Sequence, residues 1–347
     1  MARATLDDVS RHAGVSRSTA SLVLNDSPQV SAKTRRRVQE SMKALGYVYN
    51  RQAAMLRTQR SMTLGLVVTE VQNPYFAELA MTLEDVADRA NYAVLIGYSR
   101  DDTARQRRLL DRLVERSVDG LILLPAGNTE AAEIDALQTA SGVPIVLLAR
   151  HFNLTHDYVG ADNVTAGRLM GDHLRSLGVR TVAFVGGPQF TSARREREEG
   201  FALASKGGAM TMLSAEGLFG EATPAGGAEA TRRLLDGGQV PDAIVAYSDI
   251  VVVGVYAELQ RRGLEPGRDI AVGGFDDIPG SAHRTPPLTT VATFPTAIGE
   301  KCGELILRRL TSPPALLEGC APEVSHLLIE PALRVRASTA AWRPRLT

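Results

Sequence analysis

The sequence predicts an N-terminal all-α bundle with a helix-turn-helix, followed by a two-lobed α/β core on two parallel sheets. Residues 5–25 hold two short amphipathic helix patterns separated by a tight turn that contains glycine. From residue 62 onward, apolar strand-like runs alternate with helix-like segments, which is typical of parallel sheets flanked by helices. The chain has 347 residues, enough for two or three domains and a large buried core.

The helix-turn-helix pattern begins close to the N-terminus. Thr5 and Asp8 lie three residues apart ahead of an apolar periodicity, a variant of the capping box that starts helices. Gly14 ends this first helix, and Ser16 caps a second one. The turn between them is three or four residues long, which is the spacing of a helix-turn-helix. The apolar faces of the two helices carry Leu6, Val9 and Ala13, and Ala20, Val23 and Leu24.

The second helix also has a polar face. A step of about 100° per residue places Ser18, Ser21 and Leu22 opposite its apolar face, with Arg17 at the N-terminal edge. In a helix-turn-helix, such outward residues face base edges in the major groove of DNA. The alternative is an ordinary helical hairpin with a solvated polar face. A third helix over residues 31–45 completes a small bundle.

The charge distribution favours a nucleic-acid partner for the N-terminal end alone. The whole chain has a formal net charge of zero. Residues 1–60 nevertheless contain eleven lysines and arginines and four acids, so their formal charge is +7 and that of residues 61–347 is −7. A basic end on an acidic body indicates a polyanionic partner for that end. A solvated basic tail is the alternative, but a tail should lack apolar periodicity.

Residues 47–61 connect the bundle to the rest of the chain. Asn50 is a good helix cap and residues 52–57 have high helix propensity, but six to eight residues are too few for a stable free helix. Leu56 is apolar although the linker is basic. One interpretation is a plain interdomain linker. The other is a hinge helix that becomes ordered on DNA, with Leu56 as a wedge into a minor-groove step.

The α/β part is expected to consist of two runs of strand–helix units. The first run has strands at 62–68, 92–99, 119–126 and 143–150 and helices at 73–90, 103–117 and 129–141. After a crossing near Gly160, the second has helices at 163–178, 193–207 and 250–263 and strands at 181–187, within 241–249 and at 269–277. Residues 286–295 then cross back to a helix at 296–310.

These runs define the expected domains. A helix-turn-helix domain covers 1–48 and a hinge helix or linker covers 49–61. The first core lobe takes 62–161 and 293–324, and the second takes 162–292 and 325–341. The tail past Pro331 has no heptad pattern, so we expect a homodimer and no coiled-coil tetramer.

Three stretches carry a specific family resemblance. TLDDVSRHAGVSRSTASLVLN, then VSAKTRRRVQESMKALGY, then residues 50–56 resemble the lactose-repressor (LacI/GalR) family of transcription regulators, in order and at the family's spacing. The resemblance continues through the core. It implies a periplasmic-binding-protein-like bilobal fold, double-stranded operator DNA and a small-molecule effector as partners, and dimerisation through the core.

The resemblance also implies roles for residues of the N-terminal domain. Arg17 and Ser18 match the two main base-reading positions, and Leu22 stands where a polar or charged residue is common. Arg17 can bond guanine O6 and N7 as a fork. Ala53 and Leu56 match minor-groove positions. Phosphate-contact positions, which set register without reading sequence, are matched by Thr5, Ser16, Thr19, Ser21, Asn25, Ser31, Thr34, Tyr47 and Asn50.

The effector is expected beyond the carboxyl ends of the strands, where open α/β sheets bind ligands. Arg197, in SARREREEGF, matches the arginine with which family members grip a sugar hydroxyl or a carboxylate. Asp276, in GGFDD, matches an acid that accepts ligand hydroxyl or N–H groups. Their alternatives are a solvated helix face for Arg197 and a helix cap for Asp276. The other candidates are Asn73, Tyr75, Phe76, Arg150, Phe190 and Ser248; the two neighbouring aromatics have a core or hinge role as their alternative.

Two departures from the family pattern bear on the ligand. Ala149 stands where many relatives carry aspartate, and Ser248 stands where many carry asparagine. Both changes remove polar contacts that sugar-binding relatives use, which puts a plain hexose in doubt. The expected effector is therefore a sugar, a sugar derivative or a small organic anion.

The favoured function is a bacterial, cytoplasmic repressor, associated with the nucleoid when bound, that an effector releases from a pseudo-palindromic operator. A corepressor-dependent repressor and an activator remain as alternatives. A doubly wound enzyme is a distant one, because GxGxxG, GxxxxGK[ST] and GxSxG are missing and six histidines show no metal spacing. Two cysteines make neither a disulfide framework nor a metal site. No catalytic residue, metal or cofactor is expected, and neither a signal peptide nor a membrane-spanning run is seen.

Overall fold

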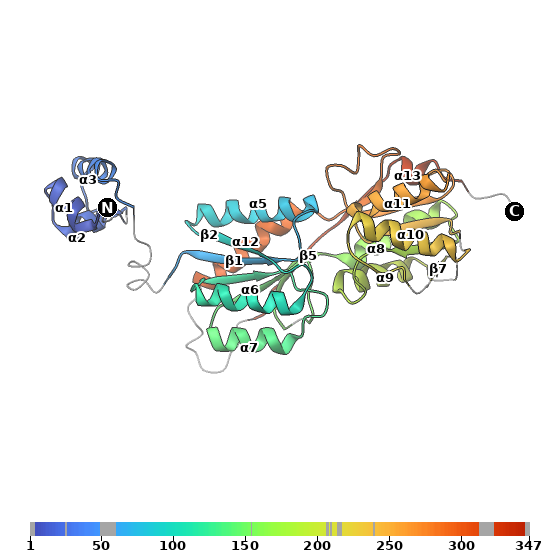
Figure 1. Ribbon diagram of the computed structural model, residues 1–347, viewed down its shortest axis with the longest axis horizontal. Coiled ribbons are helices and arrows are strands. Elements are labelled where there is room, and N and C mark those ends of the chain that lie inside the picture. Colours follow the sequence, from blue (N-terminus) through green and yellow to red (C-terminus); the bar gives the residue numbers. More distant parts are fainter. Residues whose placement is uncertain are drawn as a thin grey trace. The chain divides into compact units, whose positions relative to one another are not determined.

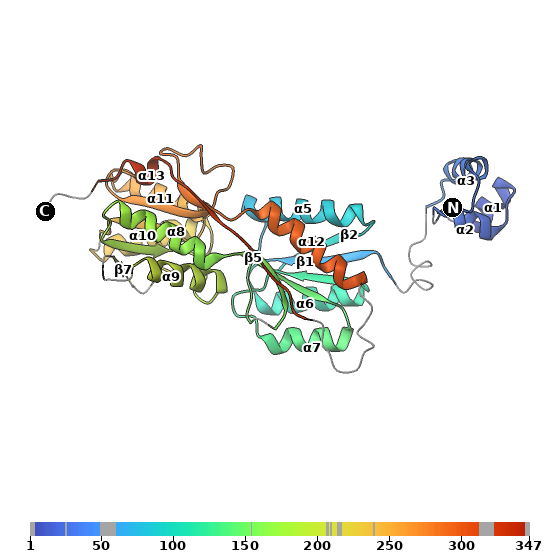
Figure 2. The same cartoon turned by 180° about the vertical axis from the view of Figure 1, so that it is seen from behind.

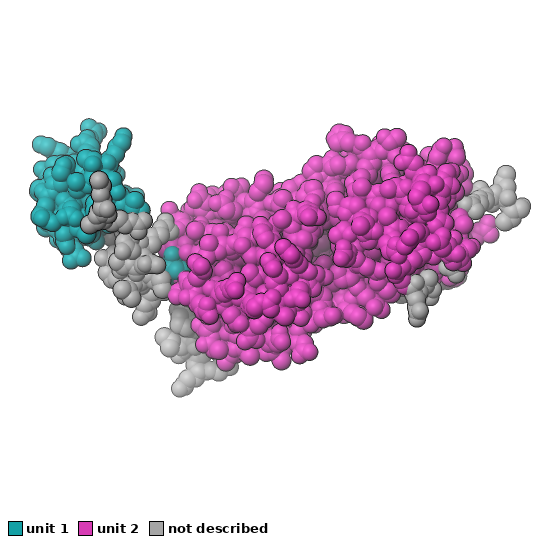
Figure 3. Space-filling view, viewed as in Figure 1, with its two compact units in different colours: residues 1–61 teal, residues 62–347 magenta. Residues whose placement is uncertain are grey.

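The structure is a computed structural model that divides into two compact units, residues 1–61 and 62–347 (Figure 3). It describes residues 4–24, 26–48, 60–153, 155–205, 208, 210–213, 217–238, 240–311 and 323–343. The expected hinge helix therefore lies outside the described residues, and each unit is treated by itself below.

The first unit is a three-helix bundle whose starts and stops follow the expected capping residues. Its helices are α1 (Leu6–Ala13), α2 (Arg17–Leu24) and α3 (Ala32–Ala44). The hydroxyl of Thr5 accepts from the amide of Asp8 at 3.3 Å, and the Asp8 carboxylate accepts from the Thr5 amide at 2.9 Å. Gly14 ends α1 with φ 61°, a left-handed conformation that glycine adopts without strain. The expected capping box is thus confirmed.

The bundle closes on a small apolar core. Side chains from all three helices are buried there, and partly buried apolar side chains pack around them. Ser16 Oγ accepts from the Thr19 amide at 3.1 Å and Ser31 Oγ from the Thr34 amide at 3.3 Å, so α2 and α3 begin where the sequence indicated. The buried set is Val9, Ala13, Ala20, Val23 and Val38.

The second unit has two lobes, each a sheet with helices on both faces (Figures 1 and 2). The first sheet has the order β11-β5-β4-β3-β1-β2, and all its strands are parallel. Helices α5 and α12 pack on one face, and α6 and α7 cover the other. The strands are β1 (Thr63–Val68), β2 (Ala93–Tyr98), β3 (Gly120–Leu123), β4 (Ile145–Leu148), β5 (Asp157–Ala161) and β11 (His326–Ile329), and the helices α5 (Pro74–Arg89), α6 (Thr103–Glu115), α7 (Ala131–Ser141) and α12 (Pro295–Thr311).

The second lobe repeats this plan with one antiparallel edge strand. Its sheet order is β12-β10-β9-β8-β6-β7, with β12 antiparallel to β10. Helices α8 and α9 pack on one face, and α10 and α11 on the other. The strands are β6 (Thr181–Val185), β7 (Thr211–Leu213), β8 (Ala243–Ala246), β9 (Ala271–Asp276), β10 (Thr289–Ala292) and β12 (Ala332–Arg334), and the helices α8 (Asn163–Ser176), α9 (Ser192–Ala204), α10 (Pro224–Asp236), α11 (Asp249–Arg261) and α13 (Ala337–Ala340).

The crossings near Gly160 and within residues 286–295 lie where the sequence indicated, but both segments contain strands that were not expected. The chain leaves the first lobe directly after β5 and returns between β10 and α12. Residues 325–341 were assigned to the second lobe, but β11 pairs in parallel with β5, so this part belongs to the first sheet. The free edge of β5 explains this, because a further strand satisfies its backbone groups. The last crossing between the lobes, which was expected before residue 325, therefore follows β11.

Close helix packing in the second lobe sets the position of a candidate site residue. A Cβ at Gly167 on α8 would meet the Arg197 carbonyl oxygen at 2.0 Å, and one at Gly200 on α9 would meet the Val164 carbonyl oxygen at the same distance. Only glycine allows the two backbones to approach this closely. This contact brings Asn163, the first residue of α8, beside Arg197.

Candidate functional site

The candidate base-reading residues lie on the open side of α2. The Arg17 side chain is 72% exposed, and its Nε lies 3.3 Å from Asp7 Oδ1. Ser18 is exposed, and Leu22 is among the exposed large apolar side chains. These three residues therefore share a solvent-facing surface that no described part of the bundle covers.

The described phosphate-contact candidates gather mostly at helix starts. Thr5 precedes α1, Ser16 and Thr19 lie at the start of α2, and Ser31 and Thr34 lie at the start of α3. Helix N-termini attract phosphate through free amides and the helix dipole. Ser21 and Tyr47 are half-buried. Outside the described residues lie Asn25, Asn50, Ala53 and Leu56.

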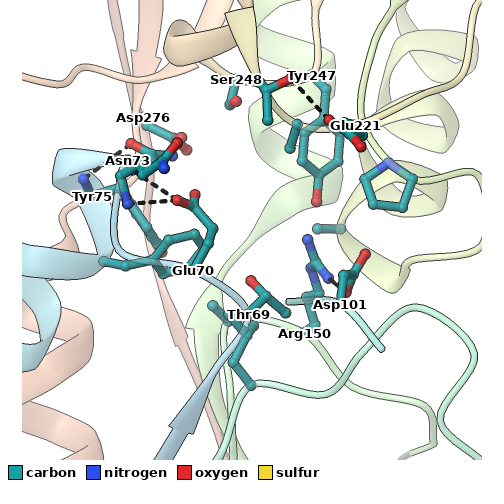
Figure 4. Close-up of a pocket in the computed structure, with 18 of the residues that line it drawn as sticks. Thr69, Glu70, Asn73, Tyr75, Asp101, Arg150, Glu221, Tyr247, Ser248 and Asp276 are labelled. Atoms are coloured by element: carbon teal, nitrogen blue, oxygen red, sulfur yellow. Dashed lines mark hydrogen bonds and ion pairs between the residues drawn. The ribbon is translucent and has the colours of Figure 1, made fainter. Parts of the chain in front are cut away.

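A cleft of about 650 Å³ lies between the two lobes of the core (Figure 4). Segments that follow strands β1, β2, β4, β8 and β9 contribute to it, as expected for the carboxyl ends of parallel strands. In Figure 4, Glu70, Asn73 and Asp276 form one group, and Asp101 and Arg150 lie near Tyr247 in another. Among the expected effector residues, those lining the cleft are Asn73, Tyr75, Phe76, Arg150, Arg197, Ser248 and Asp276.

Phe190 does not line the cleft, which corrects the expectation for this residue. It is 67% exposed and lies in the turn just before α9. The loop after β6 instead brings Pro188 to the cleft. Sequence position after a strand was the only signal for Phe190, and it does not determine which residue of a turn points inward.

Arg197 is held in place by groups of the second lobe. It is 6% exposed, which removes the solvated-face interpretation. Its Nε donates to Asn163 Oδ1 at 2.9 Å and its Nη1 to the Tyr247 carbonyl at 2.5 Å. The guanidinium carbon lies 4.4 Å from the centre of the Phe275 ring. Its Nη2 lies 3.7 Å from Asp276 Oδ1, so a buried cation faces a buried carboxylate.

Asp276 ends β9 and is 7% exposed. A turn follows it and no helix, so the capping interpretation does not apply to this residue. Burial raises the pKa of Asp276 to about 6, against the opposing charge of Arg197. Above that pH the carboxylate can accept hydrogen bonds from ligand hydroxyl groups.

A second buried pair comes from the first lobe. Arg150 Nη1 lies 2.9 Å from Asp101 Oδ1, and Arg150 is 6% exposed. Burial alone would lower the pKa of Arg150, but Tyr247 and Asp101 outweigh it and hold the pKa above its usual value. Arg100, Asp101 and Ala149 all have φ near 57°. Such left-handed conformations are costly for these residues and concentrate at binding sites.

Several cleft residues were missing from the expected effector set. Glu70 and Asp101 lie in segments that the strand-end rule places at the cleft, and Tyr247 directly follows β8. Asn163 also follows a strand, but β5 was not expected from the sequence, and Glu221 follows no strand directly. Ser248 Oγ is buried without a hydrogen-bond partner in the described part of the chain, which leaves a polar atom for a ligand.

Arg194 lies in the same charged run as Arg197, but its contacts are structural. It is 1% exposed, and its Nη2 donates to the Phe184 carbonyl at 3.2 Å while Nε donates to Glu198 at 2.8 Å. Its guanidinium carbon also lies 4.4 Å from the centre of the Phe219 ring. It therefore ties α9 to strand β6 and is not among the residues that line the cleft.

Two other kinds of site are absent from the described ranges. No group of three or more histidine, cysteine, aspartate or glutamate residues there is arranged to hold a metal ion. No helix in that part of the chain has the length and apolar character needed to cross a membrane.

Comparisons with known proteins agree with this anatomy. The model for bacterial regulatory proteins of the lacI family matches residues 5–50, and the periplasmic binding protein-like domain matches residues 171–339. The ribose operon repressor of Escherichia coli K12 is 31% identical over 311 residues, covering 89% of this chain and 94% of that protein. The HTH-type transcriptional repressor PurR of Haemophilus influenzae is 29% identical over 335 residues, covering 96% and 98%.

Solved structures extend the likeness over nearly the whole chain. A Lac repressor dimer bound to operator and the anti-inducer ONPF has a TM-score of 0.82 and 25% identity, covering 97% of this chain and 99% of that one. A complex of the transcriptional regulator CelR with cellobiose has a TM-score of 0.70 and 31% identity, covering 97% and 100%. By its DNA-binding bundle, its two-lobed core and these relatives, the chain belongs to the lacI family of bacterial regulatory proteins.

Proposed function

We propose that this protein represses transcription from a pseudo-palindromic operator and that a small molecule bound in the interlobe cleft releases it. The observation that carries the proposal is the buried polar cluster of Arg197, Asp276 and Ser248 in the cleft wall. Such a cluster is costly unless a ligand or water completes its hydrogen bonds. The relatives with known roles are transcriptional repressors, which supports the direction of control.

The charges of the cleft favour a neutral, polyhydroxylated effector. Both buried arginines already face carboxylates, Arg150 with Asp101 and Arg197 with Asp276. An anionic ligand would have to separate these pairs or bring a third charge into a buried site. Hydroxyl groups both donate to a carboxylate and accept from a guanidinium, so they fit without a change of charge. The relative solved with cellobiose holds a ligand of this class.

The DNA-binding proposal assigns base reading to Arg17, Ser18 and Leu22 on the exposed face of α2. The hydroxyl groups at the helix starts bind phosphates and set the register. Ala53 and Leu56 are proposed to enter the minor groove, with Leu56 as a wedge. In this proposal the protein is located in the cytoplasm both when it is bound to operator DNA and when it is released. We assign no catalytic step and no cofactor.

A homodimer is proposed because the edge of the first sheet presents apolar side chains. Strand β2 is an edge strand, and its Leu95 and Ile96 are 39% and 43% exposed. Met81 on α5 is also exposed, at 65%. An exposed edge strand with apolar side chains normally has a partner. The Lac repressor structure is a dimer on its operator, which supports the same assembly for this chain.

The proposal is tested in two steps with the full-length protein. A binding site is first selected from random duplex DNA. Neutral mono- and disaccharides, sugar phosphates, sugar acids and nucleobases are then screened by thermal shift, and stabilising compounds are retested for release of the selected DNA. We expect neutral sugars to stabilise the protein and weaken DNA binding. A compound that tightens DNA binding would identify a corepressor, and hits confined to anions would refute the neutral-ligand assignment.

A further inference from the structure

A chain of buried hydrogen bonds runs from the first lobe to the cleft arginine of the second. His151 follows β4 in the first lobe, and its Nε2 lies 2.5 Å from Glu196 Oε1 on α9. Glu196 Oε2 accepts from Asn163 Nδ2 at 3.1 Å. Asn163 Oδ1 in turn accepts from Arg197 Nε at 2.9 Å. The four side chains therefore form one continuous path across the lobe boundary.

The two residues at the outer end of this path do not line the cleft. His151 and Glu196 are absent from its wall, whereas Asn163 and Arg197 belong to it. The side chains of His151 and Glu196 are only 12% and 18% exposed, so their contact is largely shielded from water. A charge-assisted hydrogen bond is stronger in such surroundings than at the surface.

A second contact fixes the same pair of segments. The His151 amide donates to Ser192 Oγ at 2.9 Å, and Ser192 is the first residue of α9. The His151 ring also packs edge-on against Tyr158 of β5, with ring centres 4.9 Å apart. His151 is thus held from its own lobe and reaches the other lobe through both main chain and side chain.

We propose that His151 and Glu196 form an interlobe latch that positions the effector-binding arginine. When the lobes are together, His151 orients the Glu196 carboxylate, Glu196 orients the Asn163 amide, and that amide fixes the Arg197 guanidinium. When the lobes separate, Glu196 loses its partner and Arg197 loses part of its support. Ligand binding and lobe closure are then linked, because each stabilises the arrangement that the other requires.

The latch depends on the proposed function in one respect only, namely that Arg197 contacts the effector. Its two other consequences, the lobe distance and the order of Arg197, need no ligand. A failed ligand screen would therefore count against the proposed function and leave the latch testable.

The lobe distance is measured by double electron–electron resonance on the full-length chain. Spin labels are placed at the exposed positions Glu133 on α7 and Ala202 on α9, after Cys320 is replaced by serine. Labelled protein is diluted into unlabelled protein so that distances within one chain dominate. We expect Glu196→Gln and His151→Asn each to give a longer and broader distance distribution, and the double variant to add nothing further.

The matched control breaks a histidine–carboxylate pair within one lobe. His156 Nε2 lies 3.1 Å from Asp135 Oδ1, and both residues belong to the first lobe. His156→Asn should leave the distance distribution unchanged. The latch is refuted by an unchanged distribution in both His151→Asn and Glu196→Gln, or by the same change in His156→Asn. Because Glu196→Gln keeps the size of the side chain, a cooperative thermal transition is expected for it and is recorded first.

The local order of Arg197 gives a separate measurement. It would not change if the contact between His151 and Glu196 only held the two lobes together. The Nε–H signal of Arg197 is identified in ¹H–¹⁵N spectra by its loss in Arg197→Lys. We expect slow exchange of this proton with water in the native chain and at least about tenfold faster exchange in Glu196→Gln, the population shift for about 1.4 kcal/mol. Equal exchange rates in both proteins would show that Glu196 does not position the arginine.

Discussion

The two compact units present their candidate functional side chains in opposite ways. In the unit of residues 1–61, Arg17 is 72% exposed and its fork of donors is open to solvent. In the unit of residues 62–347, Arg197 is 6% exposed. Its guanidinium donates to Asn163 and to the Tyr247 carbonyl, and it faces the Asp276 carboxylate. The arginine side chain is thus exposed to solvent in one unit and buried among protein groups in the other.

This difference agrees with what each unit is proposed to recognise. A DNA duplex is a large polyanion, and exposed cations on helix surfaces gain affinity from it by releasing its counterions. A small neutral ligand gives few contacts, so its site must be preorganised and largely free of water before binding. Variants of the two arginines should therefore differ in kind: one changes DNA binding alone, and the other changes folding stability as well.

The largest effect is expected from Arg197→Ala. This variant leaves Asp276 buried without its cation and removes two hydrogen bonds to the second lobe. Breaking a buried pair by removing one partner costs about 3–5 kcal/mol of unfolding free energy. Urea unfolding of the full-length chain measures it. The exposed neighbour Arg195 serves as the control, and Arg195→Ala should change the free energy by less than about 0.5 kcal/mol. Equal effects of the two variants would contradict the buried-pair account.

Arg17→Ala should leave stability unchanged and weaken operator binding by about 1–3 kcal/mol, with relaxed specificity at one base pair. The reason is that an exposed side chain contributes little to folding but can form a bidentate contact with guanine. Fluorescence anisotropy on selected and random duplexes measures both quantities. Arg36→Ala, another exposed arginine of the same unit, should weaken binding to the two duplexes equally. The base-reading role is wrong if Arg17→Ala behaves in the same way as this control.

The pH dependence of stability should come from the core unit. Burial raises the pKa of Asp249 to about 8, Asp276 adds to the shift, and the hydroxyl groups of Ser281 and Thr290 oppose it. The folded state then binds a proton more tightly than the unfolded state does. Stability should therefore fall as pH rises from about 4 to about 8, by up to about 1.4 kcal/mol per pH unit.

Asp249→Asn should flatten this slope, since the amide does not titrate in that range. Unfolding free energies at several pH values measure the slope, with the exposed Asp85→Asn as control. An unchanged slope in Asp249→Asn would show that this carboxyl group does not govern the pH dependence.

The smallest effect is expected from the capping box of the first unit. Thr5→Ala removes the hydroxyl that accepts from the Asp8 amide and should destabilise α1 by about 1 kcal/mol. Hydrogen exchange of the α1 amides measures this change. Exchange in the core unit should stay as it is, and faster exchange there would argue against independent units.

Sequence reasoning succeeded where the signal is local. A helix begins at the expected place after each of the capping residues Thr5, Ser16 and Ser31. A hydroxyl that accepts a hydrogen bond from the amide three residues later is a local signal, and it can be read from the sequence. Helix α10 was missed because Gly226 and Gly227 lower its helix propensity. In the structure Gly227 is needed for packing, since a Cβ there would meet the Val251 carbonyl oxygen at 2.2 Å.

The cleft was predicted less completely because burial is not local. Arg194 and Arg197 both lie in a charged run that normally indicates a solvated helix face, yet both are buried. Arg194 is hydrogen-bonded to strand β6 and Arg197 to the start of α8. The contact between His151 and Glu196 joins segments 45 residues apart, so no spacing rule could indicate it. Strand β11 was misplaced for the same reason, because its partner β5 is far away in the sequence.

The measurement that tests the central claim most directly is the operator affinity of the full-length chain with and without a compound from the screen. In the native protein, we predict that a saturating neutral sugar weakens operator binding by about 5–150-fold, the usual range of allosteric coupling. Asp276→Asn should abolish this response, while Arg17→Ala should weaken binding by the same factor with or without the sugar. A sugar that stabilises the protein in the thermal-shift screen yet leaves operator affinity unchanged would contradict the account.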